Sequence, residues 1–344
     1  MNSIKEPKRI LVFELNWLGD ILFSFPLLRA LRKAYPEAYI ACTVVPRYVD
    51  LLVNNPWIND VHALSDTNSL SSLGEKLAFI GMIRKERYDM CFLLKSSRTK
   101  AVMAALAGIR ERIGFTGKDA SLTNLVEMPM GHIHRADQIL ALAGAVGVTN
   151  ADGTYEYFVS DEDTERAEAV LHEVGGGLRR MIALNPGGNW AAKRWPRDNY
   201  IQLGKMLLDR FDDLEVMITG AKKDIDLAKE IVERVGSERC YSVAGKTGLN
   251  ELAVFFKRCD LAISADSGPL HLASAVGTTT IGIFGPTSSE ITGPRGRAKN
   301  IVLAKNVECK IPCYVKNCDR DHYCIISINA EEVYDAAVDV LLEK

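Results

Sequence analysis

Short apolar runs alternate along the first 110 residues with longer segments whose apolar side chains recur at helical spacing. The clearest case is the β-prone run Lys8 to Leu15, which leads directly into a segment with apolar residues three and four positions apart. Strands that alternate with helices favour a parallel sheet. The expected strands are residues 8–15, 39–45 and 89–94, and the expected helices are residues 20–35, 71–87 and 99–107.

This alternation weakens between about residues 150 and 178, where "TNADGTYEYF", an acidic helix and three consecutive glycines resemble a connector. It then restarts, with expected strands at 181–185, 214–220, 260–264 and 279–285 and expected helices at 222–235, between the last two strands, and at 333–342. We therefore predict two doubly wound α/β domains, residues 1–160 and 179–344, with residues 161–178 as a linker. Such sheets bind ligands beyond the carboxyl ends of their strands, so both sites are expected to open onto one cleft.

Composition agrees with this interpretation. A chain of 344 residues is long enough for two domains, and its net charge of −2 gives no field of one sign for nucleic acid. Charge or glycine interrupts the apolar runs well before the ~20 residues of a membrane span. No apolar signal region follows Met1 to Lys8. We expect a cytoplasmic protein, and the pattern leaves light attachment to a membrane surface open.

Neither half carries G-x-G-x-x-G after its first strand, and no G-x-x-x-x-G-K-[ST] occurs, which argues against dinucleotide dehydrogenases and P-loop NTPases. The second half has a different loop, "NPGGNWAAKRWPRDNY", residues 185–200. Gly187 and Gly188 let backbone amides approach a ligand closely, and Lys193 and Arg194 add positive charge beside a helix start. These features suit a diphosphate, although a solvated surface loop would have a similar composition.

Two further strand ends carry polar loops of the same kind. In "SADSGPLHLASA", residues 264–275, the start of a helix offers free amides to an anion. Asp266 or Ser267 could equally cap that helix, and His271 could be a satisfied core histidine. In "GIFGPTSSE", residues 282–290, Gly285 to Thr287 present backbone groups and a hydroxyl. Three such loops at the ends of three strands together predict a ligand site.

In the first half, "ELNWLGDILF" leaves Asp20 at the joint between a strand and a helix, where it could cap the helix or act as a catalytic base. The motifs "NWLGD", "PGG…AKRWP", "AGKTGLNELA", "SADSGPLHLASAVGT" and "FGPTS" occur in the order found in the ADP-heptose:lipopolysaccharide heptosyltransferases. From about residue 8 to 343 the chain resembles this family. "NWLGD" and "AKRWP" bring it nearer to the members that add the second heptose than to those that add the first.

The resemblance implies a GT-B fold, in which two Rossmann-like domains bind the acceptor and the nucleotide sugar respectively. It implies inverting transfer of L-glycero-D-manno-heptose from ADP-heptose to heptose I of the lipopolysaccharide inner core. The acceptor would be Kdo-lipid A or its heptosylated form, met at the inner face of the inner membrane, with no cofactor required for transfer. Three alternatives stay open: a heptosyltransferase I, a transferase for a protein or another glycan, and a non-catalytic metal-binding protein on the same fold.

The resemblance also assigns roles. Asp20 matches the general base that takes the proton of the acceptor hydroxyl, and Lys193 matches the lysine that neutralises the departing diphosphate. The expected donor-binding residues are Gly187, Gly188, Asp224, Thr247, Asp266, Ser267, Gly268, His271, Gly285, Pro286 and Thr287. The candidate residues for an anionic acceptor are Asn16, Lys95, Ser96, Arg98 and Arg112.

Four cysteines crowd into "CKIPCYVKNCDRDHYC". The spacing of Cys309, Cys313, Cys318 and Cys324 could enclose a tetrahedral Zn²⁺ or an iron centre, and many relatives of the family carry similar clusters. Because the pairs are not C-x2-C, reduced thiols or disulfides formed on handling remain the alternative. A structural metal is expected in preference to a catalytic one.

Overall fold

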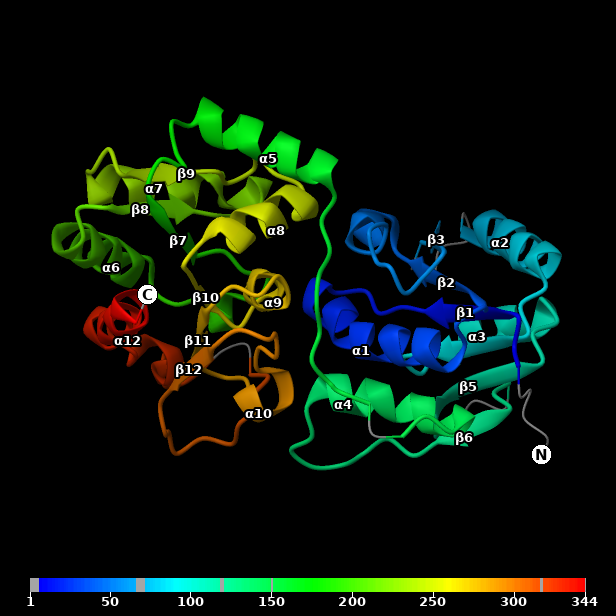
Figure 1. Cartoon of the computed structure of the whole chain (residues 1–344). Helices are drawn as coiled ribbons and strands as arrows, with labels where there is room; N and C mark the ends of the chain where they lie inside the picture. Colours follow the sequence, from blue (N-terminus) through cyan, green and yellow to red (C-terminus); the bar gives the residue numbers. More distant parts are fainter. Residues whose placement is uncertain (1–5, 66–71, 118–120, 150, 316–317, 344) are drawn as a thin grey trace. The chain divides into compact units, whose positions relative to one another are not determined.

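The computed structural model describes residues 6–65, 72–117, 121–149, 151–315 and 318–343, and it divides the chain into two compact units, Met1–Phe158 and Val159–Lys344 (Figure 1). Each unit contains one six-stranded sheet in which every pair of neighbouring strands is parallel. The prediction of two doubly wound α/β domains is confirmed.

The first unit has the strand order β3-β2-β1-β4-β5-β6. The central strand β1 is buried from Ile10 to Phe13, as expected for a strand covered on both faces. Helices α1 and α4 pack against each other, as do α2 and α3. The strands are β1 (Arg9–Phe13), β2 (Tyr39–Val44), β3 (Asp60–Ala63), β4 (Met90–Leu93), β5 (Glu111–Phe115) and β6 (Asn124–Val126), and the helices are α1 (Leu18–Ala34), η1 (Pro46–Leu51), α2 (Ser72–Glu86), α3 (Arg98–Leu106), α4 (Arg135–Leu140) and η2 (Ala141–Val146).

The second unit has the strand order β12-β11-β10-β7-β8-β9, which is the same topology with the strands renumbered. In both sheets the order reverses beside the first strand, between β1 and β4 and between β7 and β10. The strands are β7 (Arg180–Asn185), β8 (Leu214–Ile218), β9 (Cys240–Ser242), β10 (Leu261–Ala265), β11 (Thr280–Phe284) and β12 (Asn300–Ala304). The helices are α5 (Asp161–Glu173), η3 (Ala191–Lys193), α6 (Arg197–Arg210), η4 (Lys222–Asp224), α7 (Ile225–Val235), α8 (Leu249–Arg258), α9 (Gly268–Ala275), α10 (Ser289–Thr292), α11 (Tyr323–Ile326) and α12 (Ala330–Leu342).

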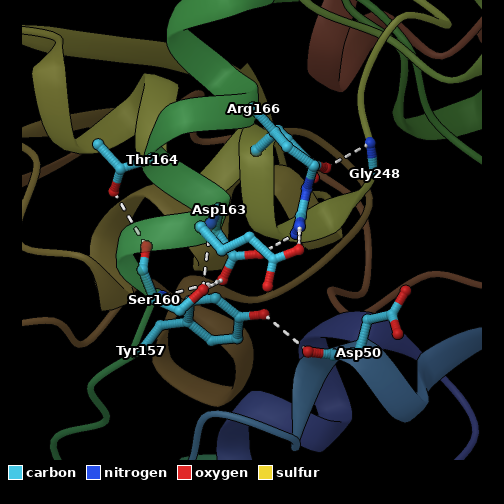
Figure 2. A network of polar contacts seen from close by, with 9 residues as sticks. Asp50, Tyr157, Ser160, Asp163, Thr164, Arg166 and Gly248 are labelled. Atoms are coloured by element: carbon cyan, nitrogen blue, oxygen red, sulfur yellow. Dashed lines mark hydrogen bonds and ion pairs between the residues drawn. The ribbon is translucent and has the colours of Figure 1, made fainter.

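The segment predicted as a linker, residues 161–178, differs from the expectation because most of it is the helix α5 within the second unit. Its start is fixed by a capping box, in which Ser160 and Asp163 exchange hydrogen bonds with each other's backbone N–H groups (Figure 2). Arg166 then pairs with Asp163 and with Glu251, whose other oxygen accepts the Gly248 N–H at the start of α8. These contacts attach α5 to α8, so the chain divides before the acidic helix.

The apolar runs that predicted strands form the interior of both sheets. A core of fully buried aliphatic side chains lies in the second unit between its sheet and α6, α7 and α12. Among the described residues, no helix is long and apolar enough to cross a membrane.

Candidate active site

The loops after β7 and β10 meet at the switch point of the second sheet, because these strands are neighbours and end at the same edge. The first loop closes with the short helix η3, which ends at Lys193. The second begins with Asp266, directly after β10. Lys193 Nζ lies 2.6 Å from Asp266 Oδ2, so the structure brings together the two charged residues that the sequence analysis assigned to the donor site.

Asp266 is almost inaccessible, and its side chain is 5% exposed. His271, from the second turn of α9, places Nε2 at 3.4 Å from the other carboxylate oxygen, Oδ1. Burial by itself would raise the pKa of Asp266, but the hydrogen bond with His271 and the positive charge of Lys193 hold that pKa well below its usual range. The carboxylate therefore stays ionised and fixes the lysine, whose partly exposed side chain remains accessible to an anion.

Buried polar contacts hold the glycine-containing loop after β7. The Asn185 Nδ2 donates to Gly187 O (3.3 Å) and to Ser264 Oγ (3.1 Å). A Cβ at Gly187 would lie 2.6 Å from Asp224 Oδ2, so a larger residue there would require the carboxylate or the loop to shift. Asp224 itself is buried and accepts the Ala221 N–H at 3.1 Å, a local contact at the start of η4. The predicted role of Asp224 in donor binding stays a prediction, as does that of the half-buried Thr247 before α8.

The start of α9 and the loop after β11 offer unused hydrogen-bonding groups. Ser267 occupies the N-cap position of α9 but makes no side-chain cap hydrogen bond, and its hydroxyl instead contacts Ser264 Oγ at 2.9 Å. The amides that open this helix, from Gly268 onward, are thus not capped by a side chain and suit an anion. In the loop Gly285-Pro286-Thr287, Thr287 is 8% exposed, and its Oγ1 has no hydrogen-bond partner among the described residues. A buried hydroxyl without a partner costs about 1–3 kcal/mol unless a ligand or water satisfies it.

Asp20 lies in the first turn of α1, on the first unit, and is half-buried. The N-cap position belongs to Trp17, which makes no side-chain cap hydrogen bond, and Asp20 is the third residue of the helix. Asn16 precedes it and accepts a hydrogen bond from Arg47 through its carbonyl (3.0 Å). The exposed Lys95 follows β4, the neighbour of β1, and therefore lies at the switch point of the first sheet.

Two more of the acceptor candidates occupy that edge, since Ser96 and Arg98 are exposed where the chain passes from β4 into α3. Arg112 does not. It is the second residue of β5, two positions before Gly114, the partner of Leu93 at the end of β4. Its guanidinium donates to the carbonyls of Ile109, Arg110 and Ser121. Arg112 thus holds local loops at the other end of the strand, and the structure does not support its assignment to the acceptor site.

Glu14, which follows β1 and is 1% exposed, was not among the predicted site residues. Ser24 Oγ donates to Glu14 Oε1 at 2.9 Å, and Lys100 Nζ donates to the Glu14 carbonyl at 3.1 Å. Burial raises the pKa of Glu14 to about 7, although Ser24, the Leu15 N–H, Lys100 and Cys42 all act to lower it. The available signal was a carboxylate within the otherwise apolar run "ILVFEL".

The four clustered cysteines are free thiols. Cys309 is exposed, and Cys313, Cys318 and Cys324 are half-buried. Within the part of the chain that the structure describes, no group of three or more His, Cys, Asp or Glu side chains is arranged to hold a metal ion. The prediction of a zinc or iron centre at these cysteines is therefore unsupported. Burial and, after it, the neighbouring Cys318, Cys309 and Cys313 raise the pKa of the Cys324 thiol, so the segment does bring its thiols near one another.

Two doubly wound units, with a lysine and uncapped helix amides at the switch point of the second, define a glycosyltransferase of the GT-B architecture. The family model for glycosyltransferase family 9 (heptosyltransferase) matches residues 77–324. The chain belongs to this family, which confirms both the resemblance seen in the motifs and the prediction of an enzyme.

Similarities to individual proteins agree with this family assignment. The chain is 26% identical over 310 residues to lipopolysaccharide heptosyltransferase 2 of Escherichia coli K12, covering 86% of this chain and 87% of that protein. It is 25% identical over 340 residues to lipopolysaccharide heptosyltransferase 1 of Campylobacter coli, covering 94% and 96%. The fold matches the structure of E. coli ADP-heptose lps heptosyltransferase II with a TM-score of 0.81, at 24% identity and coverage of 97% and 99%. It matches a family 9 glycosyl transferase from Veillonella parvula with a TM-score of 0.87, at 22% identity and coverage of 99% of each chain.

Proposed function

We propose that this enzyme transfers L-glycero-D-manno-heptose from ADP-heptose to heptose I of the lipopolysaccharide inner core, with inversion at the anomeric carbon. The observation that carries the donor half is the ion pair of the partly exposed Lys193 with the buried Asp266 at the switch point of the second sheet. The acceptor half rests on the relatives, since those named heptosyltransferase 2 and heptosyltransferase 1 both cover most of the chain. The second-heptose acceptor is favoured by "NWLGD" and "AKRWP".

In the proposed donor complex, the diphosphate of ADP-heptose lies against Lys193 and the first amides of α9. Two negatively charged groups would then share one lysine, because Asp266 already contacts Nζ. The lysine gains its full effect as charge develops on the leaving diphosphate, which is the form of stabilisation that accelerates the chemical step. Thr287 Oγ1, buried and unsatisfied, would gain a hydrogen-bond partner in the same complex.

For the acceptor, we propose that Asp20 takes the proton of the attacking hydroxyl. Lys95, Ser96 and Arg98 follow β4 and would bind the negatively charged groups of the core, for which a guanidinium and an ammonium are suited. Because this acceptor is a lipid, the proposal includes peripheral contact with the inner face of the inner membrane. Transfer is proposed to need no resident cofactor, since Lys193 supplies the positive charge that the diphosphate requires.

The acceptor is tested by supplying ADP-heptose with two defined acceptors, bare Kdo-lipid A and Kdo-lipid A that already carries the first heptose. The expected result is a mass gain of one heptose only on the heptosylated acceptor. A gain only on bare Kdo-lipid A would make the enzyme a first heptosyltransferase. No gain on either, with ADP-heptose bound, would refute the proposed acceptor and favour a protein or another glycan.

Two variants test the catalytic assignments. Lys193→Met is expected to lower kcat by about 10²–10³-fold, the usual effect of removing one group that stabilises a developing charge. Its control is Lys223→Met, because Lys223 contacts the same loop through Gly188 O and Asn189 without reaching Asp266.

Asp20→Asn is expected to lower kcat by about 10²–10⁴-fold, the range for removing a general base. The matched control is Asp161→Asn, which removes a carboxylate from the first turn of α5 and so has a similar effect on the helix dipole. Transfer by Asp20→Asn at the parent rate would refute the assignment of the base.

A further inference from the structure

An aromatic stack lies beside the lysine of the donor site. The rings of Trp190 and Tyr314 are 6.2 Å apart between centroids and inclined by only 18°. Lys193 Nζ lies 5.7 Å from the centroid of the Trp190 ring, within the range of a cation–π contact. Because Lys193 also contacts Asp266, a continuous series of contacts runs from Tyr314 through the indole to the buried carboxylate.

Tyr314 belongs to the cysteine-containing segment that the proposed reaction does not use. It remains 72% exposed in the stack, so it gains little from burial at this place. The residue before it, Cys313, donates its backbone N–H to Pro286 O at 2.7 Å, in the loop after β11. The residues after it lead to Ile325, which packs so closely on Gly285 that a Cβ there would lie 2.6 Å from the isoleucine Cβ.

We infer that Tyr314 is a positioning residue that orients Lys193 through Trp190, so that residues 309–315 serve as a brace for the donor site. The loop from Gly187 to Lys193 carries two glycines, whose conformational freedom must be restricted before the lysine can meet a diphosphate. The stacked rings restrict this loop at Trp190, while Asp266 holds the lysine. The brace thereby orders this loop before the ligand binds, so binding no longer carries the entropy cost of ordering it. This role rests on the proposed function of Lys193.

The first experiment needs no ligand. Two backbone hydrogen bonds define η3, from the Lys193 N–H to Trp190 O and from the Arg194 N–H to Ala191 O. In Tyr314→Leu, these two amides are expected to exchange hydrogen for deuterium about two- to tenfold faster, the factor that corresponds to the energy of one lost aromatic pair. The exchange is carried out on the full chain and followed by mass spectrometry. Tyr314→Phe keeps the ring and should exchange like the parent. The control is Tyr323→Leu, which removes another exposed tyrosine from α11.

The second experiment is a double-mutant cycle on ADP binding, measured by calorimetry with Tyr314→Leu and Lys193→Met. Tyr314→Leu alone should weaken ADP binding about two- to tenfold. It should have no further effect in the Lys193→Met background, because the route through the lysine is then absent. Additive losses would show that Tyr314 acts on the fold in general and would overturn the inference.

The two experiments separate this inference from the proposed function. Unchanged exchange at Lys193 and Arg194 in Tyr314→Leu would refute the brace, whether or not the enzyme transfers heptose. If the parent bound no ADP, the proposed function would fail. Accelerated exchange would in that case still support the orientation of the lysine by Tyr314.

Discussion

Replacing Glu14 by glutamine should change how the stability of the first unit depends on pH. Glu14 is buried beneath the start of α1, and its pKa rises from 4.5 to about 7 because burial disfavours the charged form. Between these two values the folded protein holds a proton that the unfolded chain has released. The folded state thus binds more protons, and the free energy of unfolding must fall as the pH rises through this window.

The magnitude follows from the difference between the two pKa values. At ~1.36 kcal/mol for each pKa unit, ionising the buried carboxyl costs about 3 kcal/mol, of which roughly 2–3 kcal/mol falls between pH 5 and pH 8. Glutamine has the same shape, and its Oε1 can accept the Ser24 hydroxyl, but it does not titrate. In the parent, Glu14 Oε2 accepts the Leu15 N–H at 3.4 Å. Glutamine places an N–H₂ group there instead, so two donors face each other and the variant is expected to be less stable at low pH.

The quantity to compare is therefore the difference in unfolding free energy between Glu14→Gln and the parent, measured at pH 5 and again at pH 8. Urea titrations followed by pulsed hydrogen exchange of peptides from β1 and α1 report on the first unit alone. The variant should gain about 2–3 kcal/mol on the parent over this interval. Parallel pH dependences would show that Glu14 is ionised in the folded protein at pH 5 and would refute the reasoning.

Two further predictions concern local packing. Gly187→Ala should weaken ADP binding about tenfold, since its Cβ would lie 2.6 Å from Asp224 Oδ2 and one of the two must shift, whereas Gly81→Ala, whose Cβ would meet nothing within 4 Å, should bind like the parent in calorimetry. Asp163→Ala should destabilise the second unit by about 1–2 kcal/mol in urea unfolding through loss of its capping box, whereas Glu162→Ala, which removes only an exposed ion pair with Arg166, should cost under about 0.5 kcal/mol.

The sequence predicted every strand inside the two sheets except β5, whose run ERIGF is interrupted by charge, and it missed the edge strands. Seven apolar runs gave β1, β2, β4, β7, β8, β10 and β11. Edge strands such as β3, β6 and β12 have few buried residues, because each has only one neighbouring strand and packs under little of the core. Pattern alone cannot distinguish such strands from loops, which is why the doubly wound class was predictable but the full strand order was not.

The site residues were predictable where charged or polar side chains directly follow a predicted strand. Lys193 and Asp266 lie in loops after two separate strands, and only the sheet order makes those strands neighbours. Arg112 was assigned from its side-chain type alone, whereas its place along β5, two residues before Gly114, comes from the sheet register. The Trp190–Tyr314 stack joins residues 124 positions apart by sequence number, and no local pattern signals a pairing over that separation.

The two sheets also share a device that only the structure reveals. At the carboxyl end of each first strand lies one buried polar residue, Glu14 after β1 and Asn185 at the end of β7. Each is fixed by a serine hydroxyl, Ser24 of α1 in one unit and Ser264 of β10 in the other. A polar group buried there must be hydrogen-bonded, and its partners determine where the following loop begins. Asparagine does not titrate, but Glu14 does. Of these two loops, only the one that leads to Asp20 therefore begins at a group that changes charge near neutral pH.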